Sequence, residues 1–231
     1  MMKIDILTIF PELFEECFSS GMPRLAIERG LLNVDAHDLR AWTKNKHKQV
    51  DDEPYGGGPG MVMKPEPLVD GISDILGHSP TLMSKGERSI LLTPQGKRLD
   101  QKVVEDLSLS KRILLVCGRY EGMDERVRSY VTDEISIGDY VISGGEMAAM
   151  VIVDAVTRLI EGVLGEKDSL IDESFINDRL EYPQYTRPPV FNGDYVPQVL
   201  LSGNHQDIDE WRKNQAKART KSRRPDLIKP D

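Results

Sequence analysis

Short apolar runs alternate with amphipathic stretches through the first two thirds of the chain. Three of the apolar runs have the length and the leucine-rich or β-branched composition of buried strands, namely Lys3–Phe10, Ser89–Thr93 and Arg112–Cys117. The second and third runs each follow a stretch with helical spacing. This alternation is typical of a parallel sheet covered by helices on both faces, so the pattern predicts an α/β domain.

The remaining apolar positions predict further elements of the same domain. Helical turns are expected after Pro11, and a short helix over Pro23–Arg29 ends at Gly30. Glu134–Ile137 and Tyr140–Ile142 read as two more short strands. A long helix is predicted from about Gly145 to Ile160, and its apolar positions at helical spacing are Met147, Met150, Val151, Ala155 and Leu159.

Three regions break this pattern. Arg40–Met61 has no sustained period, and the glycines and prolines of Pro54–Gly60 exclude a helix or a central strand there. Gly162–Asn177 has the composition of a linker, and Tyr182–Pro189 is held extended by its prolines. A last helix is predicted from about Asp207, where Asp207 and Glu210 resemble a capping box.

Charge is distributed unevenly along the chain. The 231 residues carry a formal net charge of −8. From Arg212 onward the chain has eight basic and two acidic residues, whereas the preceding residues have 22 basic and 36 acidic ones. A basic end on an acidic body is the asymmetry of an RNA-binding appendage, although a solvated helix face would look the same.

Composition also bears on where the protein works. The longest apolar stretch, Ala148–Val156, is interrupted by Asp154, and a membrane span needs roughly 20 apolar residues. The two cysteines, Cys17 and Cys117, match no metal spacing and are expected to pack as small apolar residues. We therefore expect a cytoplasmic protein with no membrane association.

Three of the predicted strands end in distinctive loops. These loops are Leu92–Lys97, Cys117–Asp124 and Ser136–Glu146. In α/β sheets, ligands bind at the carboxyl ends of strands, where glycines let the backbone approach them, so the loops could form one pocket. Neither a dinucleotide fingerprint nor a triphosphate-binding loop is present, which leaves a phosphate-free adenosine ligand allowed.

Several segments together resemble a known family. Five segments, spread in the same order over nearly the whole chain, resemble the signature segments of the bacterial tRNA (guanine-N1)-methyltransferases. They are Asp52–Met61, Cys117–Gly122, Ser136–Val141, Tyr185–Pro188 and Leu201–His205. The resemblance implies methyl transfer from S-adenosylmethionine to N1 of guanosine 37 of tRNA, beside the anticodon. Mg²⁺ has been associated with the family.

The resemblance also implies an architecture. The family belongs to the SPOUT superfamily, whose catalytic domain carries a deep trefoil knot, although protein chains generally do not thread loops. It implies an obligate homodimer whose active site is shared between subunits. Residues 1–163 would form the knotted domain, 164–177 a flexible linker, and 178–231 a small helical domain that binds tRNA.

Site residues follow by position within the family's motifs. The resemblance implies that the cofactor contacts Leu92, Thr93, Pro94, Gln95, Gly118, Tyr120, Glu121, Ser136, Ile137, Gly138, Asp139, Tyr140, Val141, Ile142, Gly144 and Gly145.

Catalysis requires a base, because neutral guanine N1 carries a proton. Arg158 matches the family's arginine that stabilises the guanine oxygen. The family usually shows Asp-Ser-Phe at the end of the linker, whereas this chain reads Asp172-Glu173-Ser174-Phe175. Glu173 therefore takes the place of the base, and Asp172, one residue earlier, is the alternative.

Two other functions remain open at this level. The chain could be a SPOUT methyltransferase for another RNA site, although the Tyr185 and Leu201 segments favour the guanine-N1 branch. It could also be a cofactor-binding RNA-binding protein whose catalysis lapsed when glutamate replaced aspartate. Arg158 and the three loops argue against the second alternative.

Overall fold

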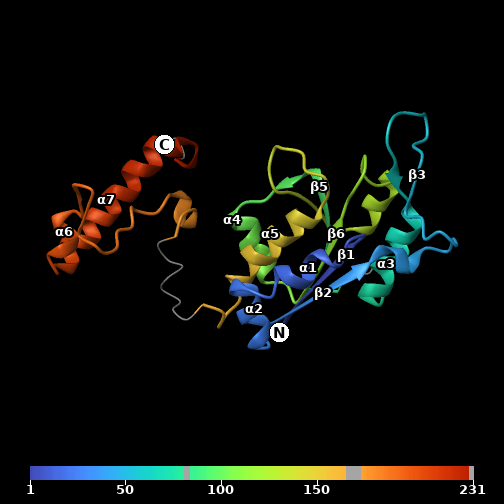
Figure 1. The fold of residues 1–231 in the computed structure, drawn as a ribbon, viewed down its shortest axis with the longest axis horizontal. Coiled ribbons are helices and arrows are strands. Elements are labelled where there is room, and N and C mark those ends of the chain that lie inside the picture. Colours follow the sequence, from blue (N-terminus) through green and yellow to red (C-terminus); the bar gives the residue numbers. More distant parts are fainter. Residues whose placement is uncertain (81–83, 165–172, 229–231) are drawn as a thin grey trace. The chain divides into compact units, whose positions relative to one another are not determined.

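The computed structural model describes residues 1–80, 84–164 and 173–228. The chain divides into two compact units, Met1–Gly165 and Glu166–Asp231, each of which is described by itself (Figure 1). Because residues 165–172 lie outside the described part, the boundaries at residues 163 and 178 stay predictions.

A five-stranded parallel sheet forms the centre of the first unit. Its order is β2-β1-β6-β5-β7. The strands are β1 (Met2–Thr8), β2 (Leu32–Asp38), β5 (Glu87–Arg98), β6 (Arg112–Cys117) and β7 (Asp133–Ser136); a separate two-stranded hairpin pairs β3 (Asp51–Asp52) with β4 (Val62–Met63). The predicted α/β class with a parallel sheet is confirmed.

Helices cover both faces of this sheet. They are α1 (Leu13–Cys17), α2 (Gly21–Glu28), α3 (Pro65–Leu76), α4 (Gln101–Ser108), α5 (Glu146–Thr157) and the 3-10 helices η1 (Leu39–Trp42) and η3 (Glu125–Tyr130). Successive side chains of β6 enter two different cores, as the pleat requires. Ile113 and Leu115 pack with α2, α4 and α5, whereas Leu114 and Val116 pack with α3 and η3. Figure 1 shows α4 and α5 together on one side of the sheet.

Two predictions within this unit are wrong. Tyr140–Ile142 is not a strand but part of an irregular segment, and Val141 is 87% exposed. The long helix is four residues shorter than predicted, and its buried face is Ala148, Ala149, Ile152, Val153 and Val156. Met147 and Val151, two of the apolar positions at helical spacing, are exposed, so α5 is apolar on its exposed side as well.

The second unit is organised around one long helix, α7 (His205–Arg223). The other elements are α6 (Gln198–Leu201), the 3-10 helices η5 (Ile176–Asp178) and η6 (Pro225–Leu227), and the hairpin strands β8 (Val190–Phe191) and β9 (Asp194–Tyr195). The predicted start of the last helix is wrong by two residues. Asn204 is the N-cap, since its side-chain oxygen accepts a hydrogen bond from the Gln206 amide, and Asp207 instead accepts one from Asn204 Nδ2.

Both cysteines are free thiols within the first unit. Cys117 is buried in the core and Cys17 packs against it. In the described part of the chain, no helix combines the length and the apolar character that crossing a membrane requires.

Candidate functional site

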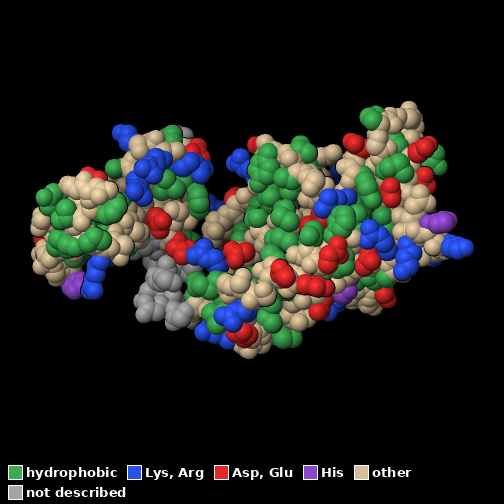
Figure 2. Space-filling view, viewed as in Figure 1, with side chains coloured by type: hydrophobic (Ala, Val, Ile, Leu, Met, Phe, Trp, Pro, Cys, Tyr) green, Lys and Arg blue, Asp and Glu red, His purple; other side chains and the backbone are tan. Residues whose placement is uncertain are grey.

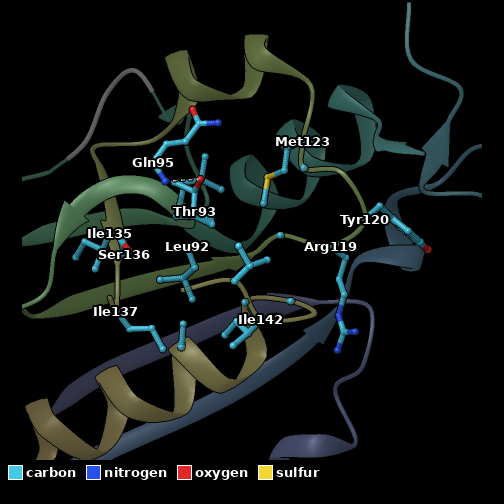
Figure 3. Close-up of a pocket in the computed structure, with 18 of the residues that line it drawn as sticks. Leu92, Thr93, Gln95, Arg119, Tyr120, Met123, Ile135, Ser136, Ile137 and Ile142 are labelled. Carbon is cyan, nitrogen blue, oxygen red and sulfur yellow. Dashed lines mark hydrogen bonds between the residues drawn. The ribbon is translucent and has the colours of Figure 1, made fainter. Parts of the chain in front are cut away.

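The three loops singled out by the sequence line one cavity of about 470 Å³. β6, β5 and β7 are neighbours in the sheet and run parallel, so their carboxyl ends meet at one edge. Figure 3 shows Leu92, Met123 and Ser136, one from each loop, around the same space. The structure therefore forms a cavity at the place where ligands of open α/β sheets bind.

Nearly all residues expected to contact a cofactor lie on this cavity. Those that line it are Leu92, Thr93, Pro94, Gln95, Gly118, Tyr120, Glu121, Ser136, Ile137, Gly138, Tyr140, Val141, Ile142, Gly144 and Gly145. Asp139 does not line it. Its side chain is 88% exposed and lies 3.9 Å from the guanidinium of Arg98.

One wall is a bulge in β5. Leu92 and Lys97 both pair with Ile135, so the intervening Thr93–Gly96 segment is displaced out of the ladder. Gly96 is required where the bulge returns, because a Cβ there would lie 2.4 Å from the Ile135 nitrogen. The bulge places Thr93, Pro94 and Gln95 over the cavity.

The opposite wall is the segment that joins β7 to α5. It crosses back over the strand ends, and the Gly145 amide donates to the Gly118 carbonyl at 2.9 Å. A Cβ on Gly145 would lie 2.8 Å from the Cys117 Cα, so only glycine allows this close approach of two backbones. Two loops far apart in sequence are thereby fixed against each other.

A buried ion pair between Glu146 and Arg119, which lines the cavity, supports this junction. Glu146, 1% exposed, accepts from Arg119 Nε at 3.0 Å and from the Thr8 hydroxyl at 2.8 Å. The Arg119 guanidinium also stacks on the ring of Phe10, 4.6 Å from its centroid. The pair therefore ties together the ends of β1 and β6 and the first turn of α5.

The glycine-rich segment, residues 54–60, leads to Met61 and Met63, which are hydrogen-bonded to the loop after β6. The Glu121 amide donates to the Met61 carbonyl at 3.0 Å, and the Met63 amide donates to the Gly122 carbonyl at 2.9 Å. Tyr120 adopts a left-handed conformation (φ 59°), which is uncommon for a residue other than glycine. Tyr55, at the tip of the glycine-rich segment, is fully exposed.

The electrostatics of the cavity differ from those of a phosphate site. Its two basic side chains are already paired, Arg119 with Glu146 and Arg128 with Glu125 and Glu134. Burial raises the pKa of the Cys117 thiol well above its ordinary value, and the Glu146 carboxylate adds to this effect. Burial also raises the pKa of Tyr120, with a contribution from Asp51. The cavity therefore offers no unpaired cation to a phosphate.

Sequence reasoning missed one part of the wall. Glu125 and Arg128 lie beyond the predicted Cys117–Asp124 loop and also line the cavity, as do Met123 and Asp124 at the end of that loop. Hydrogen bonds from Arg126 lower the pKa of Asp124, against the opposing effect of burial. The charged run that contains Asp124 and Glu125 looks like a solvated turn, and no periodicity in it signals a cavity wall.

Of the predicted catalytic residues, Arg158 belongs to the same unit as the cavity but does not line it. Arg158 is the C-cap of α5, which begins at the cavity. At 1.5 Å per residue, Arg158 is about 20 Å along the helix from Gly145. Glu173 belongs to the second unit, and Asp172 lies outside the described residues. Among residues 1–80, 84–164 and 173–228, no three acidic, histidine or cysteine side chains are grouped so that they could hold a metal ion.

Comparison with known proteins agrees with the signature segments. The family model described as tRNA (Guanine-1)-methyltransferase TrmD matches residues 2–230. A tRNA (guanine-N(1)-)-methyltransferase of Geobacillus kaustophilus is 53% identical over 228 residues, covering 98% of this chain and 91% of the relative. The Clostridium novyi protein of the same name is 50% identical and covers 99% and 92%, and the one from Halalkalibacterium halodurans is 52% identical and covers 98% and 91%. The chain therefore belongs to the tRNA (guanine-1)-methyltransferase family.

Proposed function

We propose that the protein transfers a methyl group from S-adenosylmethionine to N1 of guanosine 37 of tRNA, beside the anticodon. One observation carries the proposal. Three loops separated by tens of residues, which the family resemblance assigned to the cofactor, converge on one cavity at the carboxyl ends of β5, β6 and β7. The names of the relatives supply the substrate class.

The lining of the cavity fits S-adenosylmethionine. Leu92, Ile137 and Ile142 offer apolar contacts to an adenine ring, and the turns at Gly118 and Gly138 offer backbone groups. The Glu121 carboxylate on the lining would favour a cationic sulfonium. The other charged side chains named for the lining are paired with one another or with neighbours, Asp124 with Arg126, Glu125 with Arg128 and Arg119 with Glu146. The bound cofactor supplies an electrophilic methyl group.

Two side chains of this chain would act on the guanine. The Glu173 carboxylate accepts the proton from N1, and the resulting negative charge spreads to the carbonyl oxygen. Arg158 stabilises that oxygen with its guanidinium, which is always charged. Loss of the N1 proton to Glu173 would leave N1 as the nucleophile for the methyl group that the bound cofactor would supply.

The local structure around Glu173 supports its assignment as the base. The Glu173 carbonyl accepts a hydrogen bond from the Ile176 amide at 3.3 Å. Ile176 lies in a tight turn in which Phe175, Asn177 and Asp178 have positive φ and the Phe175 amide donates to the Arg179 carbonyl. The next residues are tied to α7, because the Leu180 amide donates to the Thr220 hydroxyl at 3.0 Å. The fold of the second unit thus sets the position of Glu173, which supports its assignment.

The position of Arg158 supports a homodimer with shared active sites. Since about 20 Å of helix separates Arg158 from the cavity of its own chain, it would serve the cavity of a second copy. α5 also presents Met147 and Val151, which are 49% and 46% exposed, to a partner of the same kind. An isologous contact through α5 would bring the two together.

Other expectations from the family remain part of the proposal. The crossing of residues 137–145 over the ends of β5 and β6 supports a trefoil knot in residues 1–163. Exposed Lys213, Lys217 and Lys221 on α7 support tRNA binding by residues 178–231 after a linker at 164–177. Any Mg²⁺ would act with the RNA, and the reaction would take place in the cytoplasm.

The test is to identify the modified nucleoside. Unmodified tRNA is incubated with the protein and S-adenosylmethionine, then digested and analysed by mass spectrometry, with cofactor binding measured separately by calorimetry. 1-Methylguanosine in the anticodon-loop fragment supports the proposal. A different methylated nucleoside would favour another RNA site, and cofactor binding without methylation would favour a lapsed enzyme.

A further inference from the structure

Arg128 on η3 joins three elements around the cavity. Its Nη2 donates to Gln95 Oε1 at 2.7 Å, and its Nε donates to Glu125 at 2.8 Å. Its Nη1 contacts the Glu134 carboxylate on β7. The side chain is 23% exposed and lines the cavity. Its contacts with the carboxylates of Glu125 and Glu134 hold it in place.

Gln95 lies at the centre of the β5 bulge. Its side chain extends away from Leu92 and from the cavity floor in Figure 3. The Gln95 amide donates to the Thr93 hydroxyl at 3.3 Å, which is a bond within the bulge itself. Among the described residues, Arg128 supplies the side-chain hydrogen bond that reaches the bulge from another part of the chain.

We propose that Arg128 is a positioning residue that holds the Thr93–Gly96 bulge against η3 through its hydrogen bond to Gln95. This contact, which we call the latch, slows dissociation of the methyl donor. The inference rests on the proposed function, since it assumes that the donor occupies this cavity. The bulge and η3 form two sides of the cavity wall. A bond between them restricts the opening through which a ligand leaves.

The guanidinium suits this role better than an ammonium would. Its planar fork donates in three directions at once, here to an amide oxygen and to two carboxylates. A lysine could keep one carboxylate but not the fixed approach to Gln95. The latch therefore depends on geometry as well as on charge.

Arg88 provides a matched control. It lies on β5, is 27% exposed, and pairs with two carboxylates, Asp106 and Asp133, as Arg128 does. Arg88 lies five positions before Thr93 along the strand, which is roughly 17 Å. Loss of Arg88 thus removes a comparable pair of ionic contacts without touching the cavity.

The experiment compares Arg128→Gln, Arg128→Lys and Arg88→Gln with the wild type in two measurements. The first is the dissociation rate of S-adenosylmethionine by stopped-flow displacement. The second is amide hydrogen exchange over residues 93–97 in the ligand-free protein. All variants are studied where circular dichroism shows them fully folded.

The latch predicts that Arg128→Gln dissociates the cofactor on the order of tenfold faster, the value of one charge-assisted hydrogen bond at a partly exposed site. Exchange over 93–97 rises with it, Arg128→Lys falls between, and Arg88→Gln matches the wild type. Equal effects of Arg128→Gln and Arg88→Gln, or no effect of either, would overturn the latch. If the wild type binds no cofactor, the proposed function fails, while unchanged exchange in Arg128→Gln overturns the latch independently.

Discussion

Replacing Glu146 with alanine should destabilise the first unit by about 3 kcal/mol. The substitution leaves the Thr8 hydroxyl, fully buried, without its acceptor, which costs roughly 1 kcal/mol. It also leaves Arg119 without the carboxylate at 3.0 Å. A charged hydrogen bond contributes about 1.5–3 kcal/mol, and the 22% exposure of Arg119 places the loss toward the middle of that range.

Glu146→Gln is the control that removes the negative charge facing Arg119 but keeps an acceptor for the Thr8 hydroxyl. Its carbonyl oxygen can still accept from Thr8, so a loss of only about 1 kcal/mol is expected. Unfolding in urea is followed by the fluorescence of Trp42 in a Trp211→Phe background, because Trp42 lies in the first unit and Trp211 in the second. For Glu146→Ala the midpoint should fall by roughly 1–2 M. A midpoint equal to that of the wild type, or equal losses for alanine and glutamine, would refute the reasoning.

Three further predictions test other parts of the structure. Gly145→Ala forces a Cβ to 2.8 Å from the Cys117 backbone, so calorimetry should show cofactor affinity at least about tenfold weaker, whereas Gly193→Ala, with open space around it but a positive φ, should leave affinity unchanged. Asp5 is fully buried, and although burial alone would raise its pKa, hydrogen bonds from His37 and Arg112 and the charges of Arg112 and Lys3 lower it overall. This group stabilises the fold above the unfolded pKa of about 3.9, and the contribution is lost as pH falls through the lower folded pKa. The urea midpoint of the wild type should therefore fall more steeply below about pH 4 than that of Asp5→Asn, and parallel curves would contradict this. Glu173→Gln should lower kcat by about 10²–10⁴-fold with cofactor binding unchanged, while a large gain in Glu173→Asp would indicate a crippled enzyme.

The sheet and the place of the site were predictable because each depends on a local pattern. Residues 89–92 of β5 and 113–117 of β6 are buried on both faces, which produces short apolar runs such as Ile113–Cys117. Once the strands are parallel, their following loops must meet at one edge. The convergence of Gln95, Gly118 and Gly138 follows from this rule.

The predictions of secondary structure and of buried faces were wrong where apolar residues lie outside the hydrophobic core. Tyr140–Ile142 is apolar because it lines a cavity, and a short run of this kind cannot be distinguished from a strand by its pattern. α5 carries apolar residues on its exposed side as well, so spacing alone could not identify the face that packs against the sheet.

Side-chain contacts between residues far apart in the chain could not be predicted from the sequence. Arg119 and Glu146 are 27 positions apart, and Gln95 and Arg128 are 33 apart. Neither pair shows a sequence pattern that links its members. The return of the chain across the strand ends brings Glu146 to Arg119, and the bulge in β5 brings Gln95 to Arg128 on η3.

The central claim is tested most directly by methyl transfer from labelled S-adenosylmethionine to unmodified tRNA, with guanosine 37 changed to adenosine in a parallel substrate. The account predicts incorporation of label into the tRNA with guanosine 37 and none into the adenosine variant. Equal incorporation into both would contradict the assigned position. No incorporation into either, with cofactor still bound, would contradict the activity itself.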